Sequence, residues 1–273
     1  GTQPLLESRA RSILQTPDGG YILAGLIAET AESFNKLYII KLNADGSTEW
    51  EKMYDYFPYY NMFMDLLPTS NGGYYALGTV GRWQVALPFG GWQYMGDILI
   101  YKIDDLGNVE WEKIYFVDEE FEAPISFCQF EDGQIFLAGA RNLYNELIMK
   151  LDTSFNIVWS SFAGEDVGQP SYITPTPDGN LLISGVSFLG GTNGYIKKVS
   201  PSGNILWMRI YGDAWHDYFY THLILPDGSI LIGGRNDMSS TAEVYVVKTN
   251  CMGLVTPLPQ ASFSWQANEL SPL

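Results

Sequence analysis

The chain repeats itself five times, and this repetition limits the fold more than any other feature of the sequence. Each copy contains an Asp-Gly or Asn-Gly pair followed by a short apolar stretch that ends in glycine, seven residues after the acid or amide. The copies are DGGYILAG from Asp18, NGGYYALG from Asn71, DGQIFLAG from Asp132, DGNLLISG from Asp178 and DGSILIGG from Asp227. A repeat period of about 40 to 60 residues is typical of propellers and solenoids.

A second pattern recurs in each copy: an apolar stretch with a lysine, then a turn, then a tryptophan. The two residues are nine apart in Lys41 and Trp50, Lys102 and Trp111, Lys150 and Trp159, and Lys198 and Trp207. In the fifth copy Lys248 is followed at the same distance by Pro257. We expect the tryptophans to pack between repeats, and the lysines to pack their stems on apolar neighbours with the ammonium group in solvent.

Each copy predicts four short strands, which in the first copy are expected at 12–16, 21–26, 37–42 and 48–54. Asp-Gly and Asn-Gly pairs supply the positive φ angles of tight hairpin turns, so successive strands should be antiparallel. One four-stranded sheet per repeat is the blade of a propeller. We therefore predict an all-β chain, a β-propeller with five four-stranded blades at about 8–61, 62–121, 122–169, 170–217 and 218–257. Six or seven blades are the alternative.

The fifth copy loses its fourth strand at Pro257 and Pro259, so another segment must complete that blade if the ring closes. The N-terminal TQPLLES segment is the first candidate, because it would tie both chain ends into one sheet and protect its edge. The segment ASFSWQANEL, within the C-terminal tail at 258–273, alternates like a strand and is the second. That tail is alternatively the start of a following module.

The charge balance is strongly acidic. Fifteen lysines and arginines against thirty-one aspartates and glutamates give a net charge of −16, which repels phosphate backbones and anionic membrane surfaces. Nucleic acid is therefore excluded as a partner. No apolar run approaches the ~18 residues of a membrane span, and no charged-then-apolar leader precedes the repeats. We expect an extracellular, cell-surface or periplasmic protein whose signal peptide is not present in this chain, without membrane insertion and monomeric.

Neither the cysteines nor the acids predict a metal site. Cys128 and Cys251 lie far apart and form no metal-ligand cluster, and whether they are bridged is left open. No D-x-D-x-D-G calcium loop occurs, and the Asp-Gly pairs are explained by turns.

The D-G-G-Y-x-L-A-G turn, the I-x-K-L strand and the G-x-x-x-W stretch resemble the propeller repeats of secreted bacterial surface proteins, in the style of quinoprotein-like propellers. The resemblance covers about residues 8–256, and PQASFSW resembles the opening of a PKD-like module. It implies a fold more than an activity, because propellers host enzymes, lectins and scaffolds alike. Quinone enzymes of the related superfamily use an adjacent cysteine pair, which this chain lacks, so we expect no cofactor.

A ligand site is expected where the copies differ, because residues present in every copy serve the ring. The turns joining strands one to two and three to four are short and share one face. The other connections vary and lie on the opposite face, here called the variable-loop face, which is the natural binding surface. The insertion between Gly78 and Lys102 is the most distinctive. The candidate binding residues are Trp83, Phe89, Trp92, Tyr94, Tyr59, Tyr60, Trp215 and Tyr218.

Three functional hypotheses follow. The first is a non-catalytic binding module for glycans or peptides, in which aromatic rings stack on the ligand and carboxylates accept its hydrogen bonds. The second is a glycoside hydrolase or lyase with carboxylates near the ring axis. Its candidate catalytic residues are Asp118, Glu122, Asp166 and Asp217, with His216 as a general base or a metal ligand. The third is an assembly platform of a surface protein, which needs no ligand site.

Overall fold

The computed structural model describes residues 7–28, 35–55, 61–86, 92–115, 122–141, 145–162, 168–188, 191–212, 216–238 and 241–255. All regular secondary structure in these ranges is β-strand, which confirms the all-β class. The same residues contain no helix suited to crossing a membrane.

The strands form one antiparallel sheet for each sequence repeat, and we number these sheets 1 to 5. Sheet 1 contains β1 (Glu7–Gln15), β2 (Tyr21–Ala28), β3 (Lys36–Leu42) and β4 (Thr48–Tyr54). Sheet 2 contains β5 (Asn61–Pro68), β6 (Tyr74–Ala86), β7 (Trp92–Ile103) and β8 (Val109–Tyr115), and sheet 3 contains β9 (Glu122–Gln129), β10 (Ile135–Arg141), β11 (Asn145–Leu151) and β12 (Ile157–Phe162). Sheet 4 contains β13 (Gln169–Pro175), β14 (Leu181–Ser187), β15 (Asn193–Val199) and β16 (Ile205–Tyr211), and sheet 5 contains β17 (His216–Ile224), β18 (Ile230–Met238) and β19 (Thr241–Thr249). Strand order follows the chain in each sheet, and the pair Gly96–Glu122 joins sheets 2 and 3.

The Asp-Gly turns act as expected. In the first of them Gly19 has φ +84°, a conformation that glycine adopts without the steric cost of a side chain. The Asp18 carboxylate accepts a hydrogen bond from the Gly20 amide at 3.0 Å. The turn therefore reverses the chain between β1 and β2 and aligns them for antiparallel pairing.

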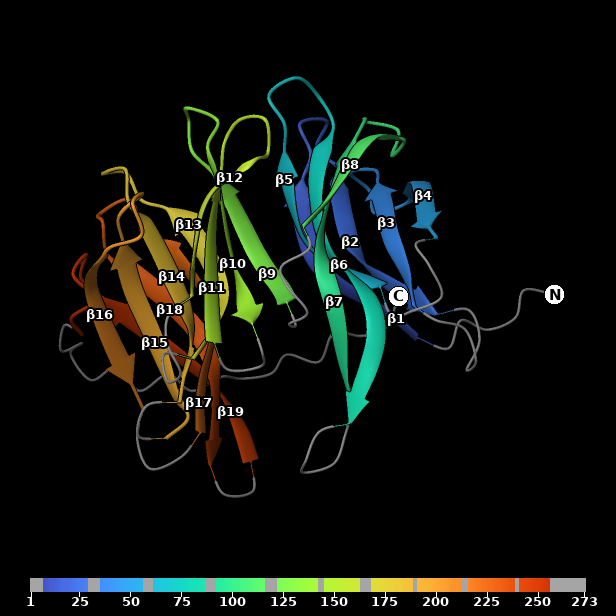
Figure 1. Cartoon of the computed structure of the whole chain (residues 1–273). Helices are drawn as coiled ribbons and strands as arrows, with labels where there is room; N and C mark the ends of the chain where they lie inside the picture. Colours follow the sequence, from blue (N-terminus) through green and yellow to red (C-terminus); the bar gives the residue numbers. More distant parts are fainter. Residues whose placement is uncertain are drawn as a thin grey trace.

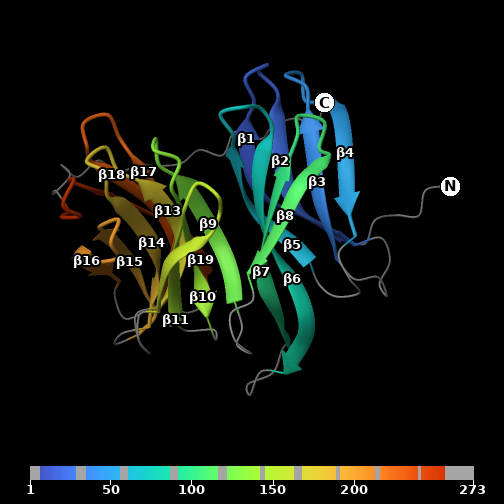
Figure 2. The ribbon, with the colours of Figure 1, turned by 45° about the horizontal axis from the view of Figure 1, so that its top comes forward.

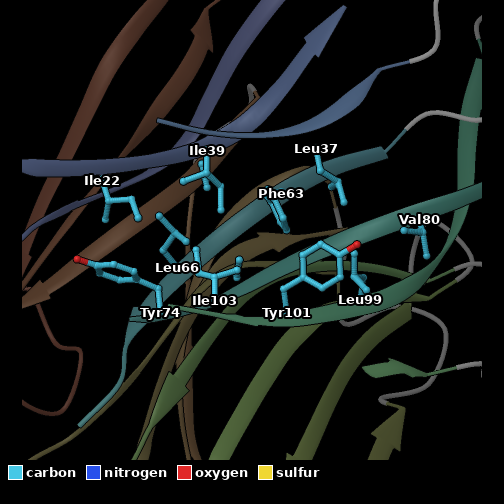
Figure 3. Packing of buried hydrophobic residues seen from close by; sticks show 12 residues of the cluster. Ile22, Leu37, Ile39, Phe63, Leu66, Tyr74, Val80, Leu99, Tyr101 and Ile103 are labelled. Atoms are coloured by element: carbon cyan, nitrogen blue, oxygen red, sulfur yellow. The ribbon is translucent and has the colours of Figure 1, made fainter. Parts of the chain in front are cut away.

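Four hydrophobic clusters hold the sheets together, one between each pair of consecutive sheets. Figure 3 shows the first, in which Ile22 and Ile39 of sheet 1 face Phe63 and Tyr101 of sheet 2. The repeated tryptophans pack against the four clusters in turn, which confirms their expected position between repeats: Trp50, Trp111, Trp159 and Trp207. The arrangement is propeller-like. In both views sheet 1 lies on the opposite side of the molecule from sheets 4 and 5 (Figure 1, Figure 2).

The chain ends bear on how the fifth sheet could be completed. The described end of the TQPLLES segment belongs to sheet 1, where Glu7 pairs with Ala28. Residues 1–6 and 256–273, with the second candidate donor, lie outside the described residues. Among the described residues, sheet 5 has three strands and one isolated bridge, in which Val255 pairs with Thr249 as Thr48 pairs with Leu42 in sheet 1.

The expectation that the strand lysines keep their ammonium groups in solvent is wrong for the first two sheets. Lys41 and Lys102 are buried. The Lys41 ammonium contacts Asp18 at 2.8 Å and Glu49 at 3.0 Å, and Lys102 contacts Glu110 at 3.1 Å. Acidic side chains around the turns replace water at the ammonium group, so the lysines connect strands within each sheet.

Candidate functional site

The insertion between Gly78 and Lys102 is a long hairpin and not the loop that its composition predicts. β6 continues to Ala86 and β7 begins at Trp92, and the backbones of Trp83 and Met95 are paired. This hairpin projects beyond the neighbouring strands (Figure 1). The insertion is rich in aromatic and β-branched residues, which favour strand pairing over an irregular loop. The side chains of Trp83, Trp92 and Tyr94 lie outside the described residues, as do Phe89, Tyr59, Tyr60 and Trp215.

Tyr218 is the predicted binding residue whose side chain is described. Its ring stacks on Tyr220 with 6.3 Å between centroids and 15° between planes. The Arg235 guanidinium lies 5.0 Å from the Tyr218 centroid and forms an ion pair with Asp237 at 2.5 Å. Tyr220 is exposed. The first two strands of sheet 5 thus carry a small aromatic and charged surface.

Of the described catalytic candidates, two are buried and one is exposed. Glu122 and Asp217 are buried, at the start of the first strands of sheets 3 and 5. The Asn236 amide donates to an Asp217 carboxylate oxygen at 2.7 Å, which ties β17 to β18. His216 is exposed beside them. Asp118 and Asp166 lie outside the described residues.

A partly buried carboxylate that the sequence analysis did not select connects three first strands. Asp65 on β5 accepts hydrogen bonds from the Ser12 hydroxyl of β1 and the Ser126 hydroxyl of β9, each at 2.9 Å. It also accepts from the Phe127 amide at 3.2 Å. Burial raises the pKa of Asp65, although the hydrogen bonds from these hydroxyl and amide donors lower it. The available signal was an acid inside the apolar strand NMFMDLLP.

The described residues form a cavity of about 1490 Å³ on the face of the short turns, opposite to the variable-loop face. We call it the turn-face groove. Its lining comes from the Asp-Gly turns of sheets 3, 4 and 5, at residues 129–132, 175–179 and 224–228, and from the turns that follow β15 and β19. The groove therefore crosses three repeats.

The lining of the groove combines apolar and charged side chains. Leu206 and Met252 are exposed there, next to the partly buried Trp207. The Lys198 ammonium contacts the Asp178 carboxylate at 2.6 Å. Hydrogen bonds from Lys198 and then from Thr176 lower the pKa of Asp178 to about 2, so this carboxylate is ionised at neutral pH. Such a surface can hold both apolar groups and hydrogen-bonding groups of a ligand.

The sequence analysis missed the groove because it treated every short turn as part of the scaffold. A signal was nevertheless present at the residue before the repeated tryptophan. That residue is Glu49 or Glu110 in the first two copies, but Val158 or Leu206 in the next two. Both apolar residues are exposed, and Leu206 lines the groove.

Two further features limit the chemistry of the described surface. No three histidine, cysteine, aspartate or glutamate side chains gather into a metal site within the described ranges. Both cysteines are free thiols: Cys128 is buried, and Cys251 is exposed at the groove.

Comparisons with known proteins agree on the fold. No family model and no curated protein matches the chain. A protein of unknown function from Dyadobacter fermentans matches with a TM-score of 0.62 and 13% identity, over 89% of this chain and 79% of that one. The K499G mutant of NanB sialidase from Streptococcus pneumoniae matches with a TM-score of 0.53 and 13% identity, over 80% of this chain and 35% of that one. At these identities the likeness is one of fold, and the chain is an all-β protein with a propeller-like arrangement of repeat sheets.

Proposed function

We propose that the protein is a non-catalytic extracellular module that binds an extended peptide or glycan chain. The observation that carries the proposal is the turn-face groove, which is open, crosses three repeats and presents apolar side chains beside an ionised ion pair. An extended ligand fits this shape, because it can contact each turn in succession. A β-propeller in which the five repeat sheets of this chain are the blades is part of the same proposal.

The buried positions of Glu122 and Asp217 favour binding over catalysis. A glycosidase needs two carboxyl groups that both reach the scissile bond. These two are buried and begin strands in sheets 3 and 5, and Asp217 is held by Asn236. We therefore propose a structural role for both carboxylates.

The variable-loop face gives the main alternative location for the same function. Trp83 and Trp92 lie on the projecting hairpin of β6 and β7, and Tyr218 stacks on Tyr220. Two sets of variants separate the two faces.

The experiment is a binding screen of the purified protein against a glycan array and a peptide library. Three variants are tested in parallel: Leu206→Ala with Met252→Ala in the groove, Trp83→Ala with Trp92→Ala on the hairpin, and Leu106→Ala as control. Leu106 is exposed in the β7–β8 turn at the position that Met252 occupies after β19. We expect the groove variant to weaken binding about tenfold or more, since each lost apolar contact contributes about 1 kcal/mol.

Loss of binding in the hairpin variant alone would move the site to the variable-loop face. Turnover of an array glycan, detected as released sugar, would replace the binding module by a hydrolase and would direct attention to Asp118 and Asp166. Absence of binding to every glycan and peptide would contradict the proposal.

A further inference from the structure

Consecutive sheets share a contact that repeats along the chain. The fourth strand of each sheet holds the turn between the third and fourth strands of the next sheet. From β4, the Trp50 indole donates to the Asp105 carbonyl at 3.2 Å, and the Tyr54 hydroxyl donates to the Gly107 carbonyl at 2.7 Å. We call this contact the tryptophan clamp.

The clamp recurs at the other three junctions. Trp111 packs on Phe155 with 4.7 Å between ring centroids, and the Tyr115 hydroxyl donates to the Phe155 carbonyl at 2.8 Å. A Cβ placed on Gly203 would lie 3.3 Å from the Trp159 ring, and one on Gly253 would lie 2.9 Å from the Trp207 ring. Each of sheets 2 to 5 therefore has its turn covered by the sheet before it.

Sheet 1 has the same turn without a clamp among the described residues. A Cβ placed on Gly46, the equivalent of Gly107, would meet nothing within 4 Å. The face of sheet 1 that points away from sheet 2 is also uncovered. Ile13 on that face is 59% exposed, whereas the residues at its position in sheets 2 to 5 are at most 4% exposed: Leu66, Phe127, Ile173 and His222.

Sheet 5 cannot provide the missing clamp. In the sequence, Pro257 stands nine residues after Lys248, where the other copies have tryptophan. Proline has neither the indole nor the backbone donor. This argument applies equally to sheet 5 of the same chain and of a second copy. Residues 1–6 contain no tryptophan. Trp265 in the tail lacks the lysine or arginine and the tyrosine that follow two and four residues later in three of the four clamp strands, β4, β8 and β16.

We propose that this uncovered face of sheet 1, with the Gly46 turn, is a docking surface for a further repeat sheet of the same kind, which carries its own tryptophan clamp and is supplied by polypeptide outside these 273 residues. The residue positions that form this surface are the positions at which sheets 2 to 5 contact the sheet before them. Its occupant is defined by chemistry: a four-stranded sheet whose last strand reads Trp-x-Lys/Arg-x-Tyr.

The test adds such a sheet to the full chain. Residues 61–121, which contain an intact clamp strand and its connection, are fused in front of Ser8, the residue that corresponds to Glu122. The reporter is Ile13→Cys in a Cys251→Ser background, and the readout is the rate of labelling by a thiol reagent. We expect the fusion to slow labelling about tenfold or more, as for a site that is open less than about a tenth of the time.

Two controls test whether the slower labelling depends on the tryptophan clamp. Replacing the copied tryptophan by alanine in the fusion should restore fast labelling. A thiol introduced as Leu106→Cys, which is exposed in sheet 2, should react equally fast with and without the added repeat. Hydrogen exchange on the fusion reports whether the added repeat is folded.

Every other outcome overturns the proposal. A folded added repeat that leaves the thiol at position 13 reactive shows that it docks elsewhere, and an added repeat that stays unfolded shows that sheet 1 does not template it. Protection that rises with protein concentration in the unfused chain assigns the face to a second copy. Protection in the unfused chain that Trp265→Ala removes assigns it to the tail.

Discussion

Polar side chains inside the sheet interfaces distinguish individual junctions of an otherwise repetitive molecule. Glu146 of sheet 3 and Lys197 of sheet 4 form a buried ion pair at positions where most other copies are apolar. The Tyr195 hydroxyl donates to the same carboxylate at 2.6 Å. Buried charges cost desolvation free energy that only their mutual attraction and hydrogen bonds offset. This pair therefore specifies which sheets meet at this junction.

We expect Glu146→Gln or Lys197→Met alone to lower the free energy of unfolding by about 3 to 5 kcal/mol, because each leaves one buried charge without its counter-ion. The double variant should recover most of this loss, since it removes both charges and retains an acceptor for Tyr195. Denaturant unfolding measures all three. Lys198→Met is the control, because its partner Asp178 is exposed and such pairs contribute less than about 1 kcal/mol. Simple additivity in the double variant would contradict the coupling.

His222 gives the junction of sheets 4 and 5 a pH dependence. Its two ring nitrogens contact the hydroxyls of Ser184 at 2.9 Å and Thr174 at 2.8 Å. Burial lowers the pKa of His222 to about 3 from an ordinary value of 6.5. Between these values the unfolded chain binds the proton and the folded chain does not, so stability falls as pH falls below 6.5.

From pH 7 to pH 5 this effect amounts to about 2 kcal/mol, which is 1.5 units at about 1.4 kcal/mol each. We expect denaturant unfolding of His222→Gln to show a smaller loss of stability over this range than the natural chain, by about that amount. Other titrating groups are common to both proteins and cancel in the comparison. Parallel pH profiles would show that His222 is not the group responsible.

At the scale of strands, the fourth strand of each sheet stabilises the sheet that follows. Trp111 on β8 packs on Tyr75 and Phe155, at 5.9 Å and 4.7 Å between ring centroids. It therefore connects two strands of sheet 2 with a turn of sheet 3. The recurrence of this residue in the sequence reflects a recurring interface and not a ligand site.

We expect Trp111→Ala to lower the free energy of unfolding by about 3 to 5 kcal/mol, the usual cost of a large aromatic truncation in a core. Leu106→Ala, five residues before it in an exposed turn, should change it by less than about 0.5 kcal/mol. Both values come from the same chemical denaturation experiment. Equal effects of the two substitutions would show that Trp111 does not stabilise the interface between sheets 2 and 3.

At the scale of the whole molecule, the described residues cover sheets 2, 3 and 4 on both faces and sheets 1 and 5 on one face. Val244 of sheet 5 is 88% exposed, whereas Leu37 and Ile98 at the same position in sheets 1 and 2 are fully buried. Stability of a repeat array depends on its nearest-neighbour interfaces, so the terminal sheets have the weaker support.

Native-state hydrogen exchange should therefore give a gradient along the chain. We expect the amides of β2 and β18 to exchange through openings of lower free energy than those of β6, β10 and β14, because the latter lie in sheets with two interfaces. Uniform protection of all five strands would show that the terminal faces are covered in solution.

Local patterns were sufficient to predict the strands. An Asp-Gly pair determines where a hairpin turns, and the alternation of apolar residues determines which face is buried, so strands such as β2 and β4 lie where the sequence predicts them. The position of Trp50 and its equivalents between sheets followed from their regular spacing. These features depend on residues that are neighbours in the sequence of a single repeat, so the sequence alone is enough to predict them.

Contacts between repeats could be decided only by the tertiary structure. Asp65 receives its donors from residues 53 and 61 positions away, and Glu146 meets Lys197 across 51 positions. The turn-face groove likewise forms where turns of three repeats converge. The repeat pattern by itself determined that the strands of each repeat pair in an antiparallel manner and that the repeat sheets follow one another along the chain. The packing of one sheet on the next determined which charges are buried, where a cavity opens and which described faces remain uncovered. These properties depend on distances between residues that lie far apart in the sequence, and no local pattern encodes such distances.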